Sequence, residues 1–235
     1  MSIRCENIDI IFDNISFLEK VNLEIPECKR VLLYGPSGSG KTSIFNVLCG
    51  LSSAKNPEAR TYWYDYSVSD LNEANKKRYQ YISLIYSNFF YMQSLSVEEN
   101  IVLPAVFAKM QSSAIAKMLD QLYTIFSFRD EGQKPLNLKD LRKRKMGQLS
   151  NGQKELVGIA RALILDTPFI FADEMLRSYN SETEKVIWEK MMSPDLGIGS
   201  KRGFFLITHK EHLKNDRRID IIYAIKNKGL ISIPR

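Results

Sequence analysis

The stretch Gly35-Pro36-Ser37-Gly38-Ser39-Gly40-Lys41-Thr42 decides the fold of this chain. It follows residues 31–34, a continuous apolar run of the kind that forms a strand buried on both faces of a sheet. Residues 43–51 come next, and their apolar positions recur at helical spacing. The octapeptide matches G-x-x-x-x-G-K-[ST] at every fixed position, in the strand–helix context that this pattern requires. The sequence therefore predicts a loop that binds the phosphates of a nucleoside triphosphate.

Each part of this loop has a chemical task. Its glycines let successive backbone N–H groups converge on phosphate oxygens, and the helix N-terminus adds partial positive charge. The Lys41 ammonium is placed to reach the β- and γ-phosphates, while the Thr42 hydroxyl can ligate Mg²⁺. The alternative is a chance turn rich in glycine and serine. The predicted nucleotide-binding residues here are Gly35, Pro36, Ser37, Gly38, Ser39, Gly40, Lys41, Thr42 and Ser43.

Composition narrows the class of protein. The chain has 235 residues, of which 44% are hydrophobic and 26% are charged, so it can bury a substantial core. Its net charge is +6, which is only mildly basic. No apolar run approaches the length of a membrane-spanning helix, and the first residues do not form a signal peptide. Three cysteines without metal-ligand spacing favour free thiols in a reducing compartment. We therefore expect a soluble intracellular domain.

The remaining segments predict an α/β fold with a largely parallel sheet. Residues 1–26 alternate apolar and polar side chains and predict antiparallel strands, with a turn at Asp13-Asn14. Three further apolar runs predict buried strands that alternate with helices: residues 82–86, 169–172 and 204–207. Residues 221–233 predict a terminal hairpin. Ligands of such sheets bind at the carboxyl ends of the strands, so we expect the functional residues there.

We expect a single domain covering residues 1–235. In this division, residues 1–87 and 149–235 form the nucleotide-binding core with its N-terminal antiparallel β subdomain. Residues 88–148 are helical in composition and predict an inserted helical lobe.

Two acidic residues follow the predicted strand at residues 169–172. Asp173 ends that strand and can hold a metal ion through water, and Glu174 can then orient or deprotonate an attacking water. An acidic pair after a strand is usually a solvated turn when it stands alone. Because this pair accompanies a phosphate-binding loop, we favour the roles of metal ligand and base.

A second motif identifies a family. The stretch Leu149-Ser150-Asn151-Gly152-Gln153 resembles the L-S-G-G-Q signature of ABC-type ATPases, and residues 158–163 resemble the helix that follows it. His209 lies where that family has its switch histidine. Together with the phosphate loop and the acidic pair, these motifs extend the resemblance over nearly the whole chain. Residues 95–101 and the chain length look most similar to the ATPase subunits of lipoprotein-release and macrolide-export transporters.

The resemblance implies a head-to-tail dimer, in which two ATP molecules with Mg²⁺ lie between the phosphate loop of one subunit and the signature of the other. Ser150, Gly152 and Gln153 would contact the nucleotide, and Ser150 would also serve as a helix N-cap. Phe12 matches the aromatic residue that stacks on adenine, although it could equally be a core residue. His209 would contact the γ-phosphate and position Glu174, with a buried core histidine as the alternative.

Three residues depart from the family pattern. Ser87 occupies the position of a glutamine that ligates Mg²⁺, and serine is too short to do so without a bridging water. Asn180 replaces an aspartate in the segment after Glu174, and Asn151 replaces the first signature glycine. The predicted metal ligands are therefore Thr42, Asp173 and Ser87. These departures raise doubts about hydrolysis and coupling more than about nucleotide binding.

The resemblance also implies a membrane partner. We expect a cytoplasmic motor subunit, peripheral to the membrane, that binds an integral permease through residues 88–93, where Phe89, Phe90 and Tyr91 could dock or form lobe core. The alternatives are a nucleotide-gated dimerisation switch, and a soluble ABC-type ATPase that acts on nucleic acid or ribosomes. Basic residues 76–78 and 142–145 could bind nucleic acid or anionic lipid, but charge runs are most often solvated surface, and we expect no specific nucleic-acid partner.

Overall fold

The computed structural model describes residues 1–13, 15–86, 90–128 and 136–234. The chain forms two compact units. Unit 1 contains Met1–Ser83, Thr167–Glu174 and Gly197–Arg235, and unit 2 contains Leu84–Asp166 and Met175–Leu196. Within the described residues no helix is both long enough and apolar enough to cross a membrane.

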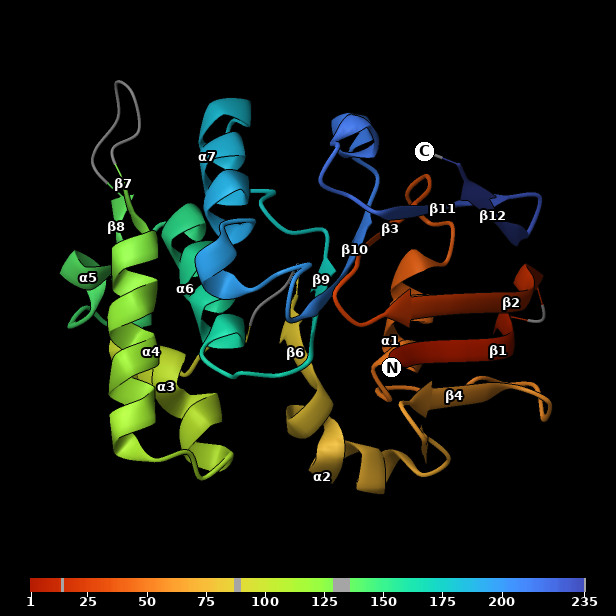
Figure 1. Ribbon diagram of the computed structural model, residues 1–235, viewed down its shortest axis with the longest axis horizontal. Coiled ribbons are helices and arrows are strands. Elements are labelled where there is room, and N and C mark those ends of the chain that lie inside the picture. The colour runs from red at the N-terminus through yellow and green to blue at the C-terminus, as the bar shows by residue number, and fades with distance from the viewer. Residues whose placement is uncertain (14, 87–89, 129–135, 235) are drawn as a thin grey trace. The chain divides into compact units, whose positions relative to one another are not determined.

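A six-stranded sheet runs through unit 1 in the order β12-β11-β3-β10-β9-β6 (Figure 1). Strand β10 pairs in parallel with β3 and β9, and β11 pairs in parallel with β3. Strand β12 closes the predicted terminal hairpin antiparallel to β11. The α/β fold with a largely parallel sheet is thus confirmed. The strands are β3 (Arg30–Tyr34), β6 (Ile82–Ile85), β9 (Phe169–Asp173), β10 (Gly203–Thr208), β11 (Ile221–Lys226) and β12 (Gly229–Ile233).

The register of this sheet brings three strand ends to one edge. Thr208 at the end of β10 lies opposite Tyr34 at the end of β3, and Ile207 lies opposite Asp173 at the end of β9. Every residue of β9 and β10 is buried, as expected for strands covered on both faces. The residues that follow these three strands are therefore neighbours at the carboxyl edge of the sheet.

The predicted antiparallel subdomain is a four-stranded sheet in the order β2-β1-β4-β5. Every second side chain of β2 from Val21 to Ile25 is buried, which explains the alternation in that part of the sequence. The indole N–H of Trp63 on β4 donates to the Leu48 carbonyl at 2.7 Å and so ties this sheet to α1. Asn14, in the predicted turn, lies outside the described residues. The elements are β1 (Ser2–Phe12), β2 (Ile15–Pro26), α1 (Lys41–Leu48), β4 (Arg60–Trp63), β5 (Tyr66–Ser67) and α2 (Leu71–Tyr81), with η3 (Glu211–Asn215) later in the same unit.

Unit 2 is mainly helical, and α3 packs against α4 and α6 (Figure 1). Ser96 and Glu99 form a capping box at the start of α3, and the buried Asn100 side chain exchanges hydrogen bonds with the backbone of Met92. The unit contains the predicted lobe and also α6 and α7; the lobe boundaries of 88–148 remain a prediction. The elements are α3 (Val97–Phe107), α4 (Ser112–Ile125), β7 (Ser127–Phe128), β8 (Leu136–Asn137), α5 (Leu138–Leu141), η1 (Met146–Gln148), α6 (Asn151–Leu163), α7 (Ser181–Met191) and η2 (Pro194–Leu196).

Candidate nucleotide site

The phosphate loop spans residues 35–40, between the end of β3 and the first residue of α1. Gly38 and Gly40 have φ angles of +77° and +93°, in the left-handed region that favours glycine. A Cβ atom on Gly40 would lie 3.0 Å from Cδ1 of Leu18 on β2. Alternation between right- and left-handed backbone directs N–H groups into an anion-binding concavity. Local backbone and packing therefore agree with the predicted loop.

Alanine at position 40 should destabilise the fold. The substitution imposes both a left-handed alanine and a contact with Leu18, so we expect the free energy of unfolding to fall by about 1–3 kcal/mol. Chemical denaturation of the nucleotide-free protein measures this change. Gly38→Ala is the matched control because its φ is also positive but nothing lies within 4 Å of the added Cβ. A Gly40→Ala protein no less stable than the Gly38→Ala protein would show that the contact with Leu18 costs nothing.

Lys41 begins α1 and is 4% exposed. Its ammonium donates to the carbonyls of Gly35 and Pro36, at 2.8 and 2.7 Å, which holds the side chain along the loop. Burial lowers the pKa of Lys41, and the carboxylates of Glu174 and Asp173 counteract this. A buried cation held by neutral carbonyls gains strongly when an anion replaces its lost hydration. Lys41 is therefore suited to bind phosphate.

The acidic pair and the histidine meet at the carboxyl edge of the sheet. Asp173 is 5% exposed, and the Glu174 N–H donates to the Ile207 carbonyl at 3.0 Å. Oε1 of Glu174 lies 2.9 Å from Nδ1 of His209. Glu174 has a φ of +43°, which a non-glycine residue adopts only under local constraint. Such strain is typical of functional residues that the surrounding strands hold in place.

The exposure of two aromatic side chains settles two sequence-based alternatives. The His209 side chain is 47% exposed, so a buried core histidine is excluded. Phe12 is 59% exposed and makes an edge contact with Phe17, at a ring-centroid distance of 6.3 Å. The Lys55 ammonium lies 5.8 Å from the Phe12 ring centroid. Phe12 is therefore not a core residue, and stacking on a base stays a prediction.

In unit 2 the signature forms the start of α6. Ser150 is the N-cap, as expected from its position: its hydroxyl accepts from the Gln153 N–H at 3.3 Å, and the Gln153 side chain accepts from the Ser150 N–H at 3.1 Å. Asn151 is the first residue of the helix and is exposed. The capping box fixes the first turn and leaves the Gly152 N–H for the predicted phosphate contact.

Of the other departures, Asn180 has a defined structural task and Ser87 lies outside the described residues. The Asn180 side chain caps α7 by accepting from the Thr183 N–H at 2.8 Å.

Two residues that hold the segment around the signature in unit 2 were missed by sequence reasoning. Glu155, 7% exposed, accepts from the N–H groups of Arg177 and Ser178, both at 3.0 Å. The Tyr179 hydroxyl donates to the Gly152 carbonyl. The sequence did contain one signal for Glu155: it is a carboxylate on the apolar face of a predicted helix.

Thr42 and Asp173 are the two predicted metal ligands that lie within the described residues. The described residues contain no cluster of three His, Cys, Asp or Glu side chains that could hold a metal ion by themselves. Mg²⁺ is usually bound by one or two protein oxygens together with phosphate oxygens and water. A hydroxyl on the first turn of α1 and a buried carboxylate at the end of β9 suit that kind of site.

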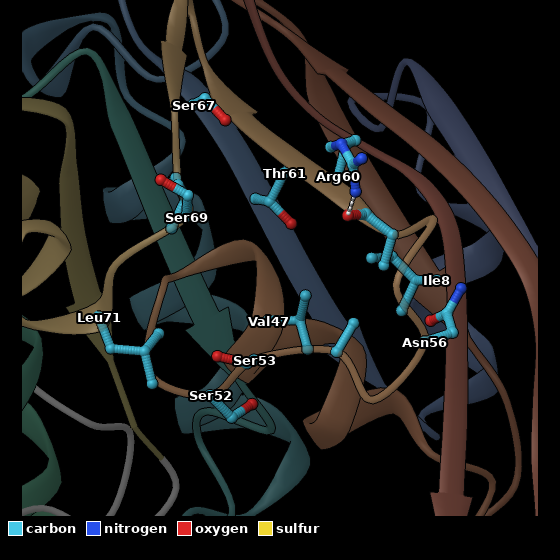
Figure 2. A pocket seen from close by; sticks show the side chains of 13 residues that line it. Ile8, Val47, Ser52, Ser53, Asn56, Arg60, Thr61, Ser67, Ser69 and Leu71 are labelled. Atoms are coloured by element: carbon cyan, nitrogen blue, oxygen red, sulfur yellow. Dashed lines mark hydrogen bonds between the residues drawn. The ribbon is translucent and has the colours of Figure 1, made fainter.

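A cavity of about 270 Å³ in unit 1 lies away from these residues (Figure 2). It is lined by parts of β1, β4, β5 and the end of α1, with the Thr61 and Ser53 side chains among those that line it. None of the predicted nucleotide-binding residues lines it. This cavity therefore does not mark the predicted nucleotide site.

Residues in both basic clusters, 76–78 and 142–145, make contacts within the chain. Lys77 lies 4.2 Å from the centroid of the Tyr66 ring, and Arg78 donates to the Cys49 and Gly50 carbonyls. In the second cluster Lys145 donates to the Ser94 carbonyl at 2.7 Å. Several of these positively charged side chains therefore stabilise the fold through contacts with neighbouring residues.

The fold and loop first define a class: a P-loop protein with a parallel sheet, an antiparallel subdomain and a helical unit that carries an L-S-x-G-Q signature. The model of the ABC transporter family matches residues 18–177, more than half of the chain. The chain belongs to the ABC transporter family, as the sequence motifs predict.

Among its relatives, the lipoprotein-releasing system ATP-binding protein LolD of Francisella tularensis subsp. holarctica is 29% identical over 215 residues, which cover 90% of this chain and 86% of that protein. The methionine import ATP-binding protein MetN 1 of Acinetobacter baylyi is 30% identical over 84% of this chain, which spans about half (52%) of that relative. The similarity to lipoprotein-release ATPase subunits is thus confirmed.

Solved structures support the fold. The dimeric structure of MJ0796, a bacterial ABC transporter cassette, has a TM-score of 0.80 at 24% identity and covers 99% of both chains. Another structure of the same cassette, in a post-hydrolysis state with ADP and Pi, has a TM-score of 0.79. The ABC ATPase fold is therefore confirmed for this chain.

Proposed function

We propose that this chain is the ATP-hydrolysing motor subunit of a membrane transporter, working as a homodimer around two ATP molecules. The observation that carries the proposal is the Glu174–His209 pair at 2.9 Å, at the sheet edge shared with Lys41 and Asp173. Membership of the ABC transporter family and the printed role of LolD, an ATP-binding protein of a lipoprotein-releasing system, support it.

Different residues of unit 1 bind the nucleotide, hold the metal ion and act on the attacking water. Loop N–H groups and Lys41 bind the β- and γ-phosphates, and Phe12 stacks on the base. Thr42 and Asp173 hold Mg²⁺, which neutralises developing charge on the phosphate oxygens when it is bound. Glu174 accepts the proton of the attacking water, and His209 holds the Glu174 carboxylate through Nδ1 and contacts the γ-phosphate.

The signature acts on the nucleotide of a second copy. Its first helical turn presents the Gly152 N–H beside the Ser150 hydroxyl, which suits a γ-phosphate, while the Gln153 N–H donates to that hydroxyl in the capping box. In the proposed dimer each ATP is bound by the loop of one copy and the signature of the other. ATP closes the two copies, and hydrolysis allows them to separate.

The permease is proposed to bind unit 2 near Phe90. That side chain is 91% exposed and Met92 is 55% exposed, so neither belongs to the core. Tyr91 is half-buried and donates to the Lys154 carbonyl at 2.5 Å, which makes it an anchor of this segment. Phe89 lies outside the described residues. The subunit would then sit at the cytoplasmic face of the membrane through its partner.

Copurification from membranes tests this assignment. The affinity-tagged chain, expressed in its own host, should bring down an integral membrane protein in detergent, and Phe90→Asp should reduce the recovered amount at least fivefold, about 1 kcal/mol of binding. Phe107→Asp is the matched control, because Phe107 is 78% exposed in the same unit but lies at the end of α3. Recovery without any membrane protein, or equal loss in both variants, would contradict the proposed docking.

A further inference from the structure

The cavity of about 270 Å³ in unit 1 is lined by none of the predicted nucleotide-binding residues and has no role in the proposed function (Figure 2). It is lined by the segment that follows α1, by β4 and β5, and by the residues that lead into α2. All of its lining residues belong to Met1–Ser83, within one compact unit. Ligand pockets typically measure about 300–1,000 Å³, so this cavity suits a small molecule.

Side-chain hydroxyls are the main polar groups of this cavity. Within the described part of the chain, none of them makes a hydrogen bond. Thr61 is 6% exposed, and Figure 2 shows its hydroxyl pointing into the space that the other labelled side chains surround. Buried polar groups nearly always have a hydrogen-bond partner, so the Thr61 hydroxyl must bind water or another molecule in the cavity. The hydroxyl-bearing residues are Ser52, Ser53, Thr61, Ser67 and Ser69.

The charge of the lining favours a neutral ligand. Among the described residues that line the cavity, Arg60 alone is charged, and its Nη1 donates to the Pro57 and Ala59 carbonyls at 2.7 and 2.8 Å. The lining contains no carboxylate that could pair with a cation. The hydroxyls both donate and accept hydrogen bonds, so the group that matches them best is another hydroxyl.

Apolar side chains complete the lining. Val47 comes from α1, Ile8 from β1, and Val68 and Leu71 from the segment between β5 and α2. Ligand pockets commonly combine such apolar surface with a few polar groups that fix the orientation of the ligand. A sugar ring or a cyclic polyol carries C–H groups as well as hydroxyls, so it can pack against the aliphatic side chains and also bind the hydroxyls.

Hydrogen bonds hold the walls of the cavity in place without a ligand. The Asn56 side chain accepts from the Asp9 N–H at 3.0 Å and donates to the Asn7 carbonyl, which ties the segment after α1 to β1. The indole N–H of Trp63 on β4 donates to the Leu48 carbonyl at the end of α1. A pocket that is already formed loses little conformational freedom when a ligand binds.

We propose that this cavity binds a neutral polyhydroxylated molecule of monosaccharide size, such as a hexose or a cyclic polyol, through the hydroxyls of Thr61 and Ser67. The site goes beyond the proposed function and does not depend on it. Val47, near the end of α1, lines the cavity, whereas Lys41 begins the same eight-residue helix. Such a helix is about 12 Å long, so this ligand and a nucleotide can be bound together.

Nuclear magnetic resonance titration of the isotope-labelled full-length chain tests the site, with D-glucose and myo-inositol as probes. We expect saturable shifts of the backbone amide signals of residues 52–54 and 67–69, with dissociation constants of about 1–10 mM, because each neutral hydrogen bond contributes little net free energy. D-Glucuronate, a similar ring with a carboxylate, should bind at least about fivefold more weakly, because the lining does not compensate its charge. Saturating ADP should change the dissociation constants by less than about twofold.

Thr61→Val should raise the dissociation constant of the tighter probe about fivefold, because valine keeps the shape of threonine and removes the hydroxyl. Ser67→Ala should raise it about threefold, and this exposed position tests the site even if Thr61→Val does not fold. Ser232→Ala is the matched control: it also removes an exposed hydroxyl from a strand of unit 1, but Ser232 does not line the cavity, so binding should be unchanged. The unfolding temperature without probe shows whether each variant keeps its fold.

Four results would overturn the proposal and leave the proposed function standing. If neither probe gives saturable shifts at residues 52–54 and 67–69 at about 50 mM, the cavity holds only water. If D-glucuronate binds as tightly as D-glucose, the ligand class is wrong. If ADP displaces the probes, they occupy the nucleotide site instead. If the folded Thr61→Val and Ser67→Ala chains bind like Ser232→Ala, the cavity hydroxyls do not bind the probes.

Discussion

Lys41→Met should lower the affinity for ATP about 100-fold or more and abolish detectable hydrolysis. Lys41 is the only side-chain cation of the phosphate loop, so no other residue of the loop can supply a positive charge beside the phosphates. Lys41 is only 4% exposed, so water does not readily take its place. Hydrogen bonds to charged groups contribute about 1.5–3 kcal/mol each, so the loss of the Lys41 bonds to two phosphates corresponds to about 100-fold or more in affinity. Titration calorimetry with ATP and Mg²⁺ measures the loss directly.

The same substitution should leave the nucleotide-free fold largely intact. Burial lowers the pKa of Lys41, which means that the fold pays a desolvation cost to keep this ammonium charged. Methionine fills a similar volume without that cost, although the bonds to the Gly35 and Pro36 carbonyls are lost. We expect the unfolding temperature to change by less than about 4 °C. Unchanged ATP affinity in a folded Lys41→Met protein would exclude the loop as the phosphate site.

Glu174→Gln should reduce kcat by about 10²–10⁴ while ATP binding is retained, because an amide cannot accept the proton of the attacking water. The glutamine keeps the size of the side chain and can still pair with Nδ1 of His209. Phosphate release at saturating ATP, with the membrane partner present, measures kcat. Glu211→Gln is the control, since that carboxylate is 74% exposed and pairs with Lys214.

This experiment also separates an enzyme from a switch. Equal rates near zero in the native chain and in Glu174→Gln, measured with the partner, would favour a nucleotide-gated dimerisation switch. The departures at Asn151 and Asn180 are the reason to make this comparison. Asn180 is a helix cap, so its replacement by aspartate would preserve the cap and add the family's charge.

Most of the candidate site could be predicted from the sequence because local patterns encode it. The phosphate loop is a contiguous motif, and the apolar runs before Gly35, Glu174 and His209 identify three strands of the parallel sheet. Once that sheet is parallel, the register of its strands makes these residues neighbours. Ser150 followed by Gln153 likewise predicts a capping box from spacing alone.

Other features depend on contacts between distant residues. Glu155 accepts hydrogen bonds from Arg177 and Ser178, more than 20 positions along the chain, and no local pattern marks a tyrosine as the partner of Gly152. The exposure of Phe12 depends on how far the β1–β2 hairpin extends beyond the sheet core, which alternation cannot fix. The boundary between the units is also a property of packing, since α6 and α7 belong with the helical unit.

The central claim is that one chain supplies two parts of a nucleotide site that close only between two copies. The most direct measurement is the mass of the Glu174→Gln chain by light scattering, with ATP and Mg²⁺ and then with ADP and Mg²⁺. The account predicts twice the chain mass of 27.1 kDa with ATP and a single chain with ADP. A single chain in saturating ATP, or the same dimer in both nucleotides, would contradict it.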